Sequence, residues 1–217
     1  MQGGTVAGPK WGSSVQKQFR ETLAYGKIAE SQLINWLRFE RGFTIIPAYE
    51  IEHPCGKGPR VLTPHQGLVS PDALGIKGAD IKWFEVKHKN HFTWHRNTKR
   101  WTTGIDKHHY EDYLRVANHF GWPVWMLFLH KDPKPRADDI GHGCPAVCPT
   151  GLFCGEIVDL ASKINHPSNK WGRHGMVYWA IEDAAQGRHG LRRIASVADV
   201  LRAQMRVPDV LSDEPPF

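Results

Sequence analysis

A hairpin signal in the first half of the sequence constrains the fold of this chain more than any other feature. Two extended runs, residues 69–76 and 81–87, are joined by a short turn at 77–80 that contains a glycine. This pattern predicts two antiparallel strands that form a β-hairpin. Such a hairpin would bring Asp72 on the first strand beside Glu85 on the second.

The second predicted strand alternates apolar and charged residues, as Phe84-Glu85-Val86-Lys87. Because successive side chains of a strand point to opposite faces, Glu85 and Lys87 should share one face. Phe84 and Val86 then point to the other face, where they can pack under a helix. The charged face would therefore combine Glu85 and Lys87 with Asp72 from across the hairpin.

These three charged groups suit the hydrolysis of a phosphodiester. Two carboxylates offer oxygen ligands to Mg²⁺, which usually keeps several water molecules and is completed by substrate phosphate oxygens. Lys87 is a point charge that can orient an attacking water and offset the negative charge that develops on the phosphate. A structural interpretation competes with this one, because Glu and Lys that alternate on the wet face of a strand commonly form a solvated ion pair.

An amphipathic helix is predicted upstream, over residues 21–41, and it ends at a glycine, as helices often do. Leu23, Ile34 and Leu37 form its apolar stripe, and Glu30 lies within that stripe. A carboxylate on an apolar stripe is costly unless it is paired, hydrogen-bonded or close to a metal ion. Glu30 therefore either joins the charged site or sits at the edge of the stripe and reaches water.

The order of these parts resembles the PD-(D/E)XK nuclease superfamily, which has a restriction-endonuclease-like core. The parts are the helix with Glu30, the strands with Pro71-Asp72 and Glu85-Val86-Lys87, and a further helix and strand, together about residues 20–130. The resemblance implies an α/β fold with a mixed central β-sheet flanked by helices. It also implies that Asp72 and Glu85 bind Mg²⁺ or Mn²⁺ with the Val86 carbonyl as a further ligand, that Lys87 assists the nucleophilic water, and that Glu30 supports the metal shell.

A second helix and a buried strand are predicted after the hairpin. The helix, residues 105–120, carries His109, Tyr113 and Val116 on one face, and the apolar run 124–129 is typical of a strand buried on both sides. His109-x-x-x-Tyr113 resembles the Gln-x-x-x-Tyr motif of the RecB-like branch, with His in place of Gln. The resemblance implies a role near the scissile strand; the alternative is a pair of half-buried residues whose polar tips reach solvent.

Residues 87–101 interleave basic and aromatic side chains between these elements. Basic groups neutralise phosphates and aromatic rings stack on unpaired bases, so we predict a loop that binds nucleic acid beside the site. The side chains expected to contact the substrate are Lys89, Arg96, Lys99 and Arg100. Alternatively, the segment is a solvated connection whose Trp94 and Trp101 pack against the core.

Three of the four cysteines lie close together in the sequence, at Cys144, Cys148 and Cys154. Clustered thiols in a cytosolic chain suggest a metal site more than a disulfide. With His142 the three could hold Zn²⁺, and with Cys55 they could hold a 4Fe-4S cluster, which is similar to the iron-sulfur staple of some RecB-like nucleases. The remaining option is that they bind no metal and that Cys154 is a buried strand residue.

With 217 residues, of which 41% are hydrophobic, the chain can bury one substantial core and a small appendage. We expect a flexible N-terminal segment over 1–19, the nuclease-like core over 20–130, an extension with the cysteine-containing loop over 131–211 that packs on the core, and a tail over 212–217. The net charge of +6 favours a polyanionic partner. No run is apolar enough to span a bilayer and no signal peptide is evident, which predicts a cytoplasmic protein of bacterial or phage type without a membrane partner.

These observations predict a Mg²⁺-dependent deoxyribonuclease acting in DNA repair, phage replication or defence. They do not distinguish exonuclease from endonuclease or DNA from RNA, and a homodimer would suit an enzyme that cuts both strands of a duplex. The main alternative is a non-catalytic nucleic-acid-binding or assembly module with a degenerate nuclease fold. A zinc-dependent hydrolase centred on the Cys and His cluster is less favoured, because thiolate-rich zinc sites are usually closed and structural.

Overall fold

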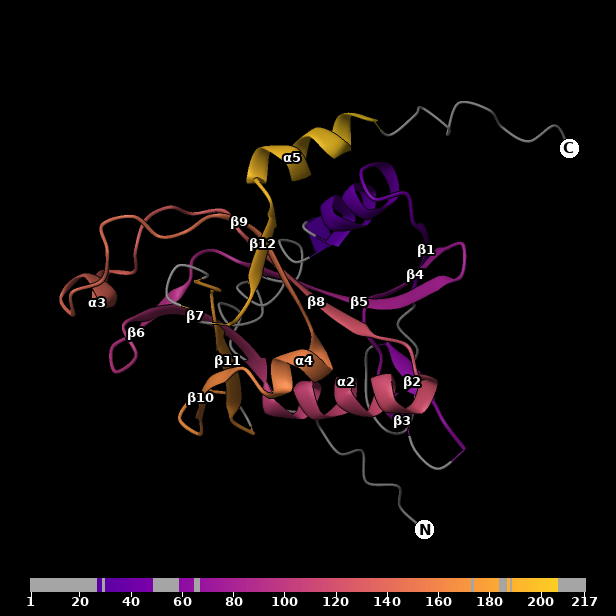
Figure 1. Ribbon diagram of the computed structural model, residues 1–217, viewed down its shortest axis with the longest axis horizontal. Coiled ribbons are helices and arrows are strands. Elements are labelled where there is room, and N and C mark those ends of the chain that lie inside the picture. The colour runs from indigo at the N-terminus through magenta and orange to yellow at the C-terminus, as the bar shows by residue number, and fades with distance from the viewer. Residues whose placement is uncertain are drawn as a thin grey trace, which may run out of the picture.

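A mixed six-stranded β-sheet forms the centre of the molecule in the computed structural model (Figure 1). The structure describes residues 27–28, 30–48, 59–64, 67–172, 174–183, 187 and 189–206. In spatial order the strands are β1 (Thr44–Pro47), β4 (Ala73–Lys77), β5 (Asp80–Lys89), β8 (Val124–His130), β9 (Gly151–Glu156) and β12 (Arg192–Ala195). Strands β5 and β8 run parallel, and the other neighbouring strands of this sheet are antiparallel.

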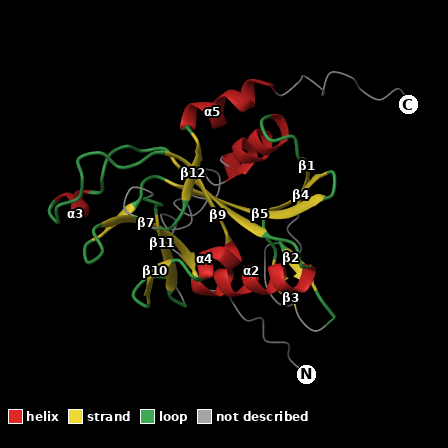
Figure 2. Cartoon of the chain, viewed as in Figure 1, coloured by secondary structure: helices red, strands yellow, loops and turns green. Residues whose placement is uncertain are grey.

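Helices cover both faces of this sheet (Figures 1 and 2). The helix of residues 30–39 lies on one face together with α5 (Val197–Arg202) and the 3₁₀ turn η2 (Ala203–Arg206). On the other face lie α2 (Lys107–Phe120) and α4 (Ile157–Ala161). The predicted α/β architecture, a mixed central sheet flanked by helices, is therefore confirmed. None of the described helices has the length and hydrophobicity that a membrane crossing requires.

The predicted hairpin is strands β4 and β5. Their antiparallel register runs from Lys77 opposite Asp80 to Ala73 opposite Phe84. Gly78 in the turn has a φ of +60°, a conformation that glycine adopts without steric cost. The register leaves residues of β5 beyond Phe84 without a β4 partner, and this end of the hairpin carries the charged groups.

Two hydrophobic cores lie on opposite faces of the central sheet, and strand β8 separates them. Met126 and Phe128 point into the core under α2, whereas Leu127 and Leu129 point into the core under the helix of residues 30–39. All four side chains are at most 2% exposed. The prediction of a strand buried on both sides is confirmed, and it explains why this run is apolar without alternation.

A second, four-stranded antiparallel sheet packs on the α2 side. In spatial order its strands are β10 (Ile164–Ser168), β11 (Met176–Ala180), β7 (Arg100–Asp106) and β6 (Thr93–His95). A short pair, β2 (Arg60–Leu62) and β3 (Gly67–Val69), is joined to α2 where the N–H of Val69 donates to the Asp112 carboxylate, 3.1 Å from N to O. The prediction that residues 87–101 form a loop is wrong in part, because most of them belong to the strands β5, β6 and β7.

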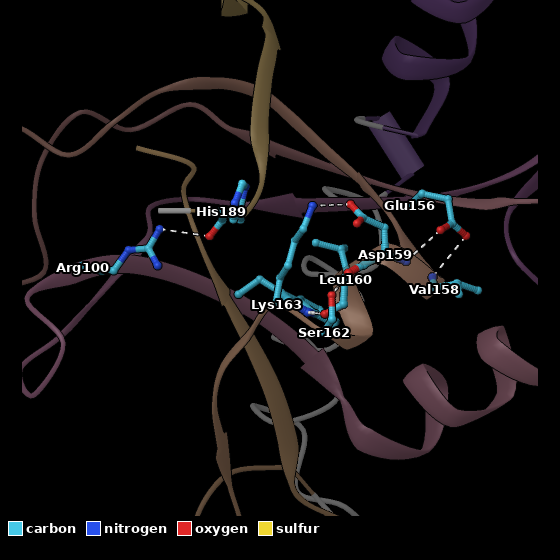
Figure 3. A network of polar contacts seen from close by, with 9 residues as sticks. Arg100, Glu156, Val158, Asp159, Leu160, Ser162, Lys163 and His189 are labelled. Atoms are coloured by element: carbon cyan, nitrogen blue, oxygen red, sulfur yellow. Dashed lines mark hydrogen bonds and ion pairs between the residues drawn. The ribbon is translucent and has the colours of Figure 1, made fainter. Parts of the chain in front are cut away.

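The helix ends follow their sequence signals. Gly42 has a φ of +72°, and the N–H groups of Gly42 and Phe43 close the preceding helix on the carbonyls of Arg38 and Leu37. Helix α4 begins at Glu156, whose carboxylate accepts hydrogen bonds from the N–H groups of Val158 and Asp159 (Figure 3). These local caps set where each helix meets the sheet.

Candidate active site

Glu85 and Lys87 lie near the middle of the central sheet, on the face of β5 that α2 covers. Glu85 is only 1% exposed, and its Oε1 forms an ion pair with the Lys87 Nζ. Phe84 and Val86 point to the opposite face and pack in the core under the helix of residues 30–39. The alternation predicted for residues 84–87 is therefore present, and it places the Glu85 carboxylate inside the protein.

Asp72 directly precedes β4 and reaches across to β5. Its Oδ2 accepts a hydrogen bond from the N–H of Val86, 2.7 Å from N to O, and its carboxyl group lies next to that of Glu85. The pairing of β4 with β5 ends at Ala73 opposite Phe84, and the Asp72 side chain takes the next N–H of β5 that points toward β4. Because the N–H and C=O of one strand residue point to the same edge, the Val86 carbonyl also faces the edge on which Asp72 lies.

The two carboxyl groups are too close, and too poorly solvated, for both to be charged without compensation. Burial raises the pKa of Asp72 to about 7, and the neighbouring Glu85 contributes to the rise. Lys87 and the Val86 N–H oppose this shift without cancelling it. Below about pH 7 Asp72 therefore keeps its proton. A divalent cation bound between the same oxygens would supply the positive charge in its place, so this donor set fits Mg²⁺ or Mn²⁺.

Lys87 is held in its charged form by these carboxylates. Burial alone would lower the pKa of Lys87, but Glu85 and Asp72 outweigh burial and hold the pKa above its usual range. The side chain retains 28% exposure. Lys87 can therefore present a permanent positive charge to a bound molecule while it remains attached to Glu85.

Glu30 lies close enough to this group for its charge to act on Lys87. It is partly buried at the start of the helix of residues 30–39, and its charge is a lesser contribution to the raised pKa of Lys87. Its helix covers the Phe84 and Val86 face of the sheet, whereas Glu85 points to the other face. In the described part of the chain, no three His, Cys, Asp or Glu side chains gather closely enough to hold a metal ion. The structure thus brings together Asp72 and Glu85, with Glu30 at the periphery.

Tyr113 supports Glu85 from the α2 side, a contact that sequence reasoning did not assign. Its ring is 2% exposed, and its hydroxyl lies close enough to the Glu85 carboxylate to act on the pKa of the phenol. Burial, followed by the negative charge of Glu85 and Asp72, holds the pKa of Tyr113 well above its ordinary value. The hydroxyl therefore stays protonated and can donate to Glu85. A tyrosine on the inward face of the helix after an E-x-K strand was the available signal for this contact.

His109 and Lys89 extend the site along α2 and β5. Burial, with the positive charges of His108 and Lys87, lowers the pKa of His109 to about 4, so the imidazole is neutral at neutral pH. Burial and the charge of Lys87 also lower the pKa of Lys89, while Asp106 opposes that shift. Lys89 is partly exposed on the same face of β5 as Lys87. A neutral imidazole and a second ammonium group therefore border the carboxylate pair.

The other predicted substrate contacts lie on the β6–β7 hairpin. Arg96 and Lys99 are exposed in its turn. Arg100 instead donates hydrogen bonds to the carbonyls of Ile181 and His189, the second shown in Figure 3, and so ties the hairpin to the segment that follows β11. Trp94 and Trp101 are at most 9% exposed and pack edge to face, with ring centroids 5.1 Å apart, as the alternative interpretation of this segment expected.

The cysteine cluster does not form. Cys148 is buried in the core under α2 and Cys144 packs against that core, whereas Cys154 on β9 is buried in the core on the opposite face. The central sheet therefore separates Cys154 from the other two thiols. Neither the zinc set with His142 nor the iron-sulfur set can be assembled from these three positions; Cys55 lies outside the described residues. The interpretation of Cys154 as a buried strand residue is confirmed.

No protein-family model and no curated protein matches this chain. A similar solved structure is that of Hjc from Archaeoglobus fulgidus, a Holliday junction resolvase from an archaeal hyperthermophile. The match covers 81% of this chain and 98% of that chain, at 12% sequence identity and a TM-score of 0.43. A similarity of this degree does not assign a function to the chain.

Proposed function

We propose that this protein is a metal-dependent nuclease of the PD-(D/E)XK type that hydrolyses DNA phosphodiester bonds. The observation that carries the proposal is the pair of adjacent buried carboxyls, Asp72 and Glu85, next to the permanently charged Lys87. Perturbed titration caused by burial together with a specific charged neighbour is typical of functional sites. A merely solvated surface pair would not need a 1% exposed carboxylate at its centre.

The chain offers a donor set for one divalent cation. Asp72 and Glu85 would supply carboxylate oxygens, the Val86 carbonyl would add a third oxygen, and Glu30 would act through water. When bound, the ion would lower the pKa of a water molecule and neutralise phosphate oxygens. Tyr113 would hold Glu85 in position, since groups hydrogen-bonded to a ligating carboxylate tune its orientation.

Lys87 would act directly on the reacting groups. Its ammonium group remains charged and partly exposed beside Glu85, so it can orient the attacking water by hydrogen bonding. The same charge would stabilise the extra negative charge on the phosphate oxygens in the transition state. His109, neutral near pH 7, could hydrogen-bond to a phosphate or a water molecule without adding charge.

The test is cleavage of labelled single-stranded, duplex and branched DNA with Mg²⁺, Mn²⁺ or chelator. We expect Asp72→Ala and Lys87→Ala each to lower the cleavage rate by about 10²-fold or more while DNA binding is largely retained. Asp80 and Lys82 provide the matched control, because they form an ion pair of the same residue types on β5, 2.7 Å from N to O. Asp80→Ala and Lys82→Ala should cleave like the wild type.

Full activity of a purified Asp72→Ala protein would refute this mechanism. The alternative, a non-catalytic nucleic-acid-binding module, is favoured by the peripheral position of Glu30, which leaves two rather than three carboxylates together. It predicts salt-sensitive DNA binding with no cleavage under either metal. The same cleavage and binding measurements therefore separate the two functions.

A further inference from the structure

The four-stranded sheet curls until its two edges meet. Strands β6 and β10 are the edges, yet the ring of His95 on β6 stacks on the ring of His166 on β10, with centroids 3.8 Å apart and planes 10° apart. The Nδ2 atom of Asn165 holds the edges together, at 2.9 Å from the Nδ1 of His166 and 3.2 Å from the Nδ1 of His95. Beside this contact lies a cavity of about 670 Å³, bounded on its other side by residues 136–139.

One wall of the cavity is made of flat rings. Tyr178 on β11 continues the stack, with its ring 4.6 Å from that of His166 and 3° from parallel. Burial lowers the pKa of His95, and it lowers the pKa of His166 to about 4, which favours the neutral form of both imidazoles. Trp171, which is 65% exposed, lines the same cavity. The indole of Trp171 therefore offers an exposed face beside a wall of stacked rings, and a nucleobase stacks on a face of this kind.

The rim of the cavity is cationic. Arg96 from the β6–β7 turn, Arg136 and Lys170 all line it. Arg136 lies 3.8 Å from Asp138, but that carboxylate is 80% exposed, and exposed pairs of this kind hold each other weakly. The buried Asp139 accepts a hydrogen bond from the N–H of Trp94 and so is engaged by the backbone. The three cations therefore remain able to contact an anionic ligand such as a phosphate.

The cavity is electrostatically connected to the candidate active site through Asp106, the last residue of β7. The Asp106 carboxylate influences the pKa of Lys89 and of His109 on one side and that of Tyr178 on the other. Lys89 in turn lies two residues from Lys87 on the same face of β5. The Asp106 carboxylate also lies against Gly172, next to Trp171, and Thr93 of the cavity wall follows the end of β5 at Lys89 by four residues, so the cavity borders the end of the strand that carries the carboxylate site.

We propose that this cavity binds an unpaired nucleotide of the nucleic-acid substrate, with its base on the exposed indole of Trp171 beside the stacked rings of His166 and Tyr178, and its phosphates on Arg96 and Lys170. This inference rests on the proposed function, which it deepens by naming the substrate class: DNA with a single-stranded segment next to the scissile bond. A fully paired duplex keeps its bases stacked inside and offers none to the cavity.

The test measures binding in chelator, so that cleavage plays no part. The probes are fluorescein-labelled oligothymidylate, an abasic strand of equal length and a blunt duplex, followed by anisotropy. We expect the wild type to prefer oligothymidylate over the abasic strand and over the duplex. Trp171→Ala should weaken oligothymidylate binding about tenfold, because base stacking on an aromatic side chain has this order of effect, and should leave abasic binding unchanged.

The cations are tested with the double variant Arg96→Ala/Lys170→Ala. It should weaken binding of both single strands and reduce the slope of log K against log salt by about 1.4, since each phosphate contact contributes about 0.7 for single strands. The matched control is Arg202→Ala/Arg206→Ala, which removes two exposed arginines from the opposite face of the sheet and should leave the slope unchanged.

Equal wild-type affinity for the abasic strand and oligothymidylate would overturn the proposal, as would unchanged binding by Trp171→Ala. These results would leave the cleavage predictions for Asp72 and Lys87 intact. Conversely, base-dependent binding that requires Trp171, in a protein that cleaves nothing with either metal, would support the cavity assignment and refute the nuclease function. The two proposals can therefore fail separately.

Discussion

At the scale of single residues, the site is defined by carboxylates placed where water cannot fully solvate them. Asp72 substitutes for a strand partner of Val86, and Glu85 is covered by α2 and held by Tyr113 and Lys87. In the absence of a cation this arrangement costs stability, because one of the two carboxyls must be protonated or the pair must bear repulsion. The site can therefore be tested by measuring the stability of the protein, without any assay of catalysis.

Stability should depend on pH through Asp72. Its pKa is about 7 in the folded state and 3.8 ordinarily, so between these values the folded state binds more protons than the unfolded state. The contribution of this group is therefore greatest below pH 3.8 and is lost as the pH rises through 7. We expect Asp72→Asn to have a Tm several degrees above that of the wild type at alkaline pH, and a smaller advantage at mildly acidic pH, in chelator.

Divalent metal should reverse that difference. Mg²⁺ or Mn²⁺ would compensate the charged pair and raise the Tm of the wild type at alkaline pH, while Asp72→Asn, which lacks one ligand, should respond much less. Asp80→Asn is the matched control and should respond like the wild type. A wild-type Tm that is indifferent to both metals at every pH would argue against a cation site at Asp72 and Glu85.

At the scale of elements, the hairpin and α2 act together to build the site. Strand β4 ends its pairing with β5 at Ala73 opposite Phe84, which exposes the next stretch of β5 to Asp72. Helix α2 follows β7, begins at Lys107 and carries His109 and Tyr113 to the same face of the sheet. The site therefore depends on two local structures whose order in the chain is visible in the sequence.

Tyr113→Phe tests the contribution of α2. The variant removes one hydroxyl that can donate to Glu85 and preserves the ring that fills the core. We expect the metal concentration for half-maximal cleavage to rise about 10- to 100-fold, as is usual when a group supporting a metal ligand is lost. Maximal cleavage at saturating metal should recover substantially. Loss of activity with an unchanged metal requirement would contradict this positioning role.

Ser196→Ala tests a cap at the other end of the molecule. Ser196 and Asp199 form a capping box at the start of α5, each side chain bonded to the backbone N–H of the other. We expect the free energy of unfolding to fall by about 1 kcal/mol and the Tm by about 2–4 °C in a thermal scan. Ser196→Thr should restore most of this stability, because its hydroxyl can also accept the Asp199 N–H and donate to the Asp199 carboxylate. No recovery would mean that Ser196 acts in another way.

At the scale of the whole molecule, one sheet serves two cores. Strands β9 and β12, from the part of the chain beyond residue 130, extend the same sheet as β4 and β5. The two cores share β8, whose side chains alternate between them. Neither core can be exposed to water unless the helices that cover one face of this sheet detach from it. We therefore propose that the described part of the chain unfolds as one unit.

Leu33→Ala tests this coupling. Leu33 is fully buried in the core on the side away from α2, and its truncation should cost about 2–5 kcal/mol. We expect one cooperative transition at a lower Tm, with coincident curves from near-UV circular dichroism and far-UV circular dichroism. Met126→Ala, in the opposite core, should behave in the same way. Two separate transitions in either variant would show that the cores unfold independently.

The sequence alone was sufficient for the hairpin, the buried strand β8, the helix α2 and the alternation that sends Glu85 and Lys87 to one face, because these follow from residue periodicity and turn chemistry within short windows. It also placed Asp72 opposite Glu85, since a tight turn determines the register of a hairpin. Only the tertiary structure decided that Tyr113 contacts Glu85, that Glu30 stays peripheral, that the sheet separates Cys154 from Cys148, and that His95 and His166 meet across a curled sheet. Those relations depend on how elements that are distant in the chain pack together. Spacing in the sequence does not tell whether two such residues lie on the same face of a sheet or on opposite faces.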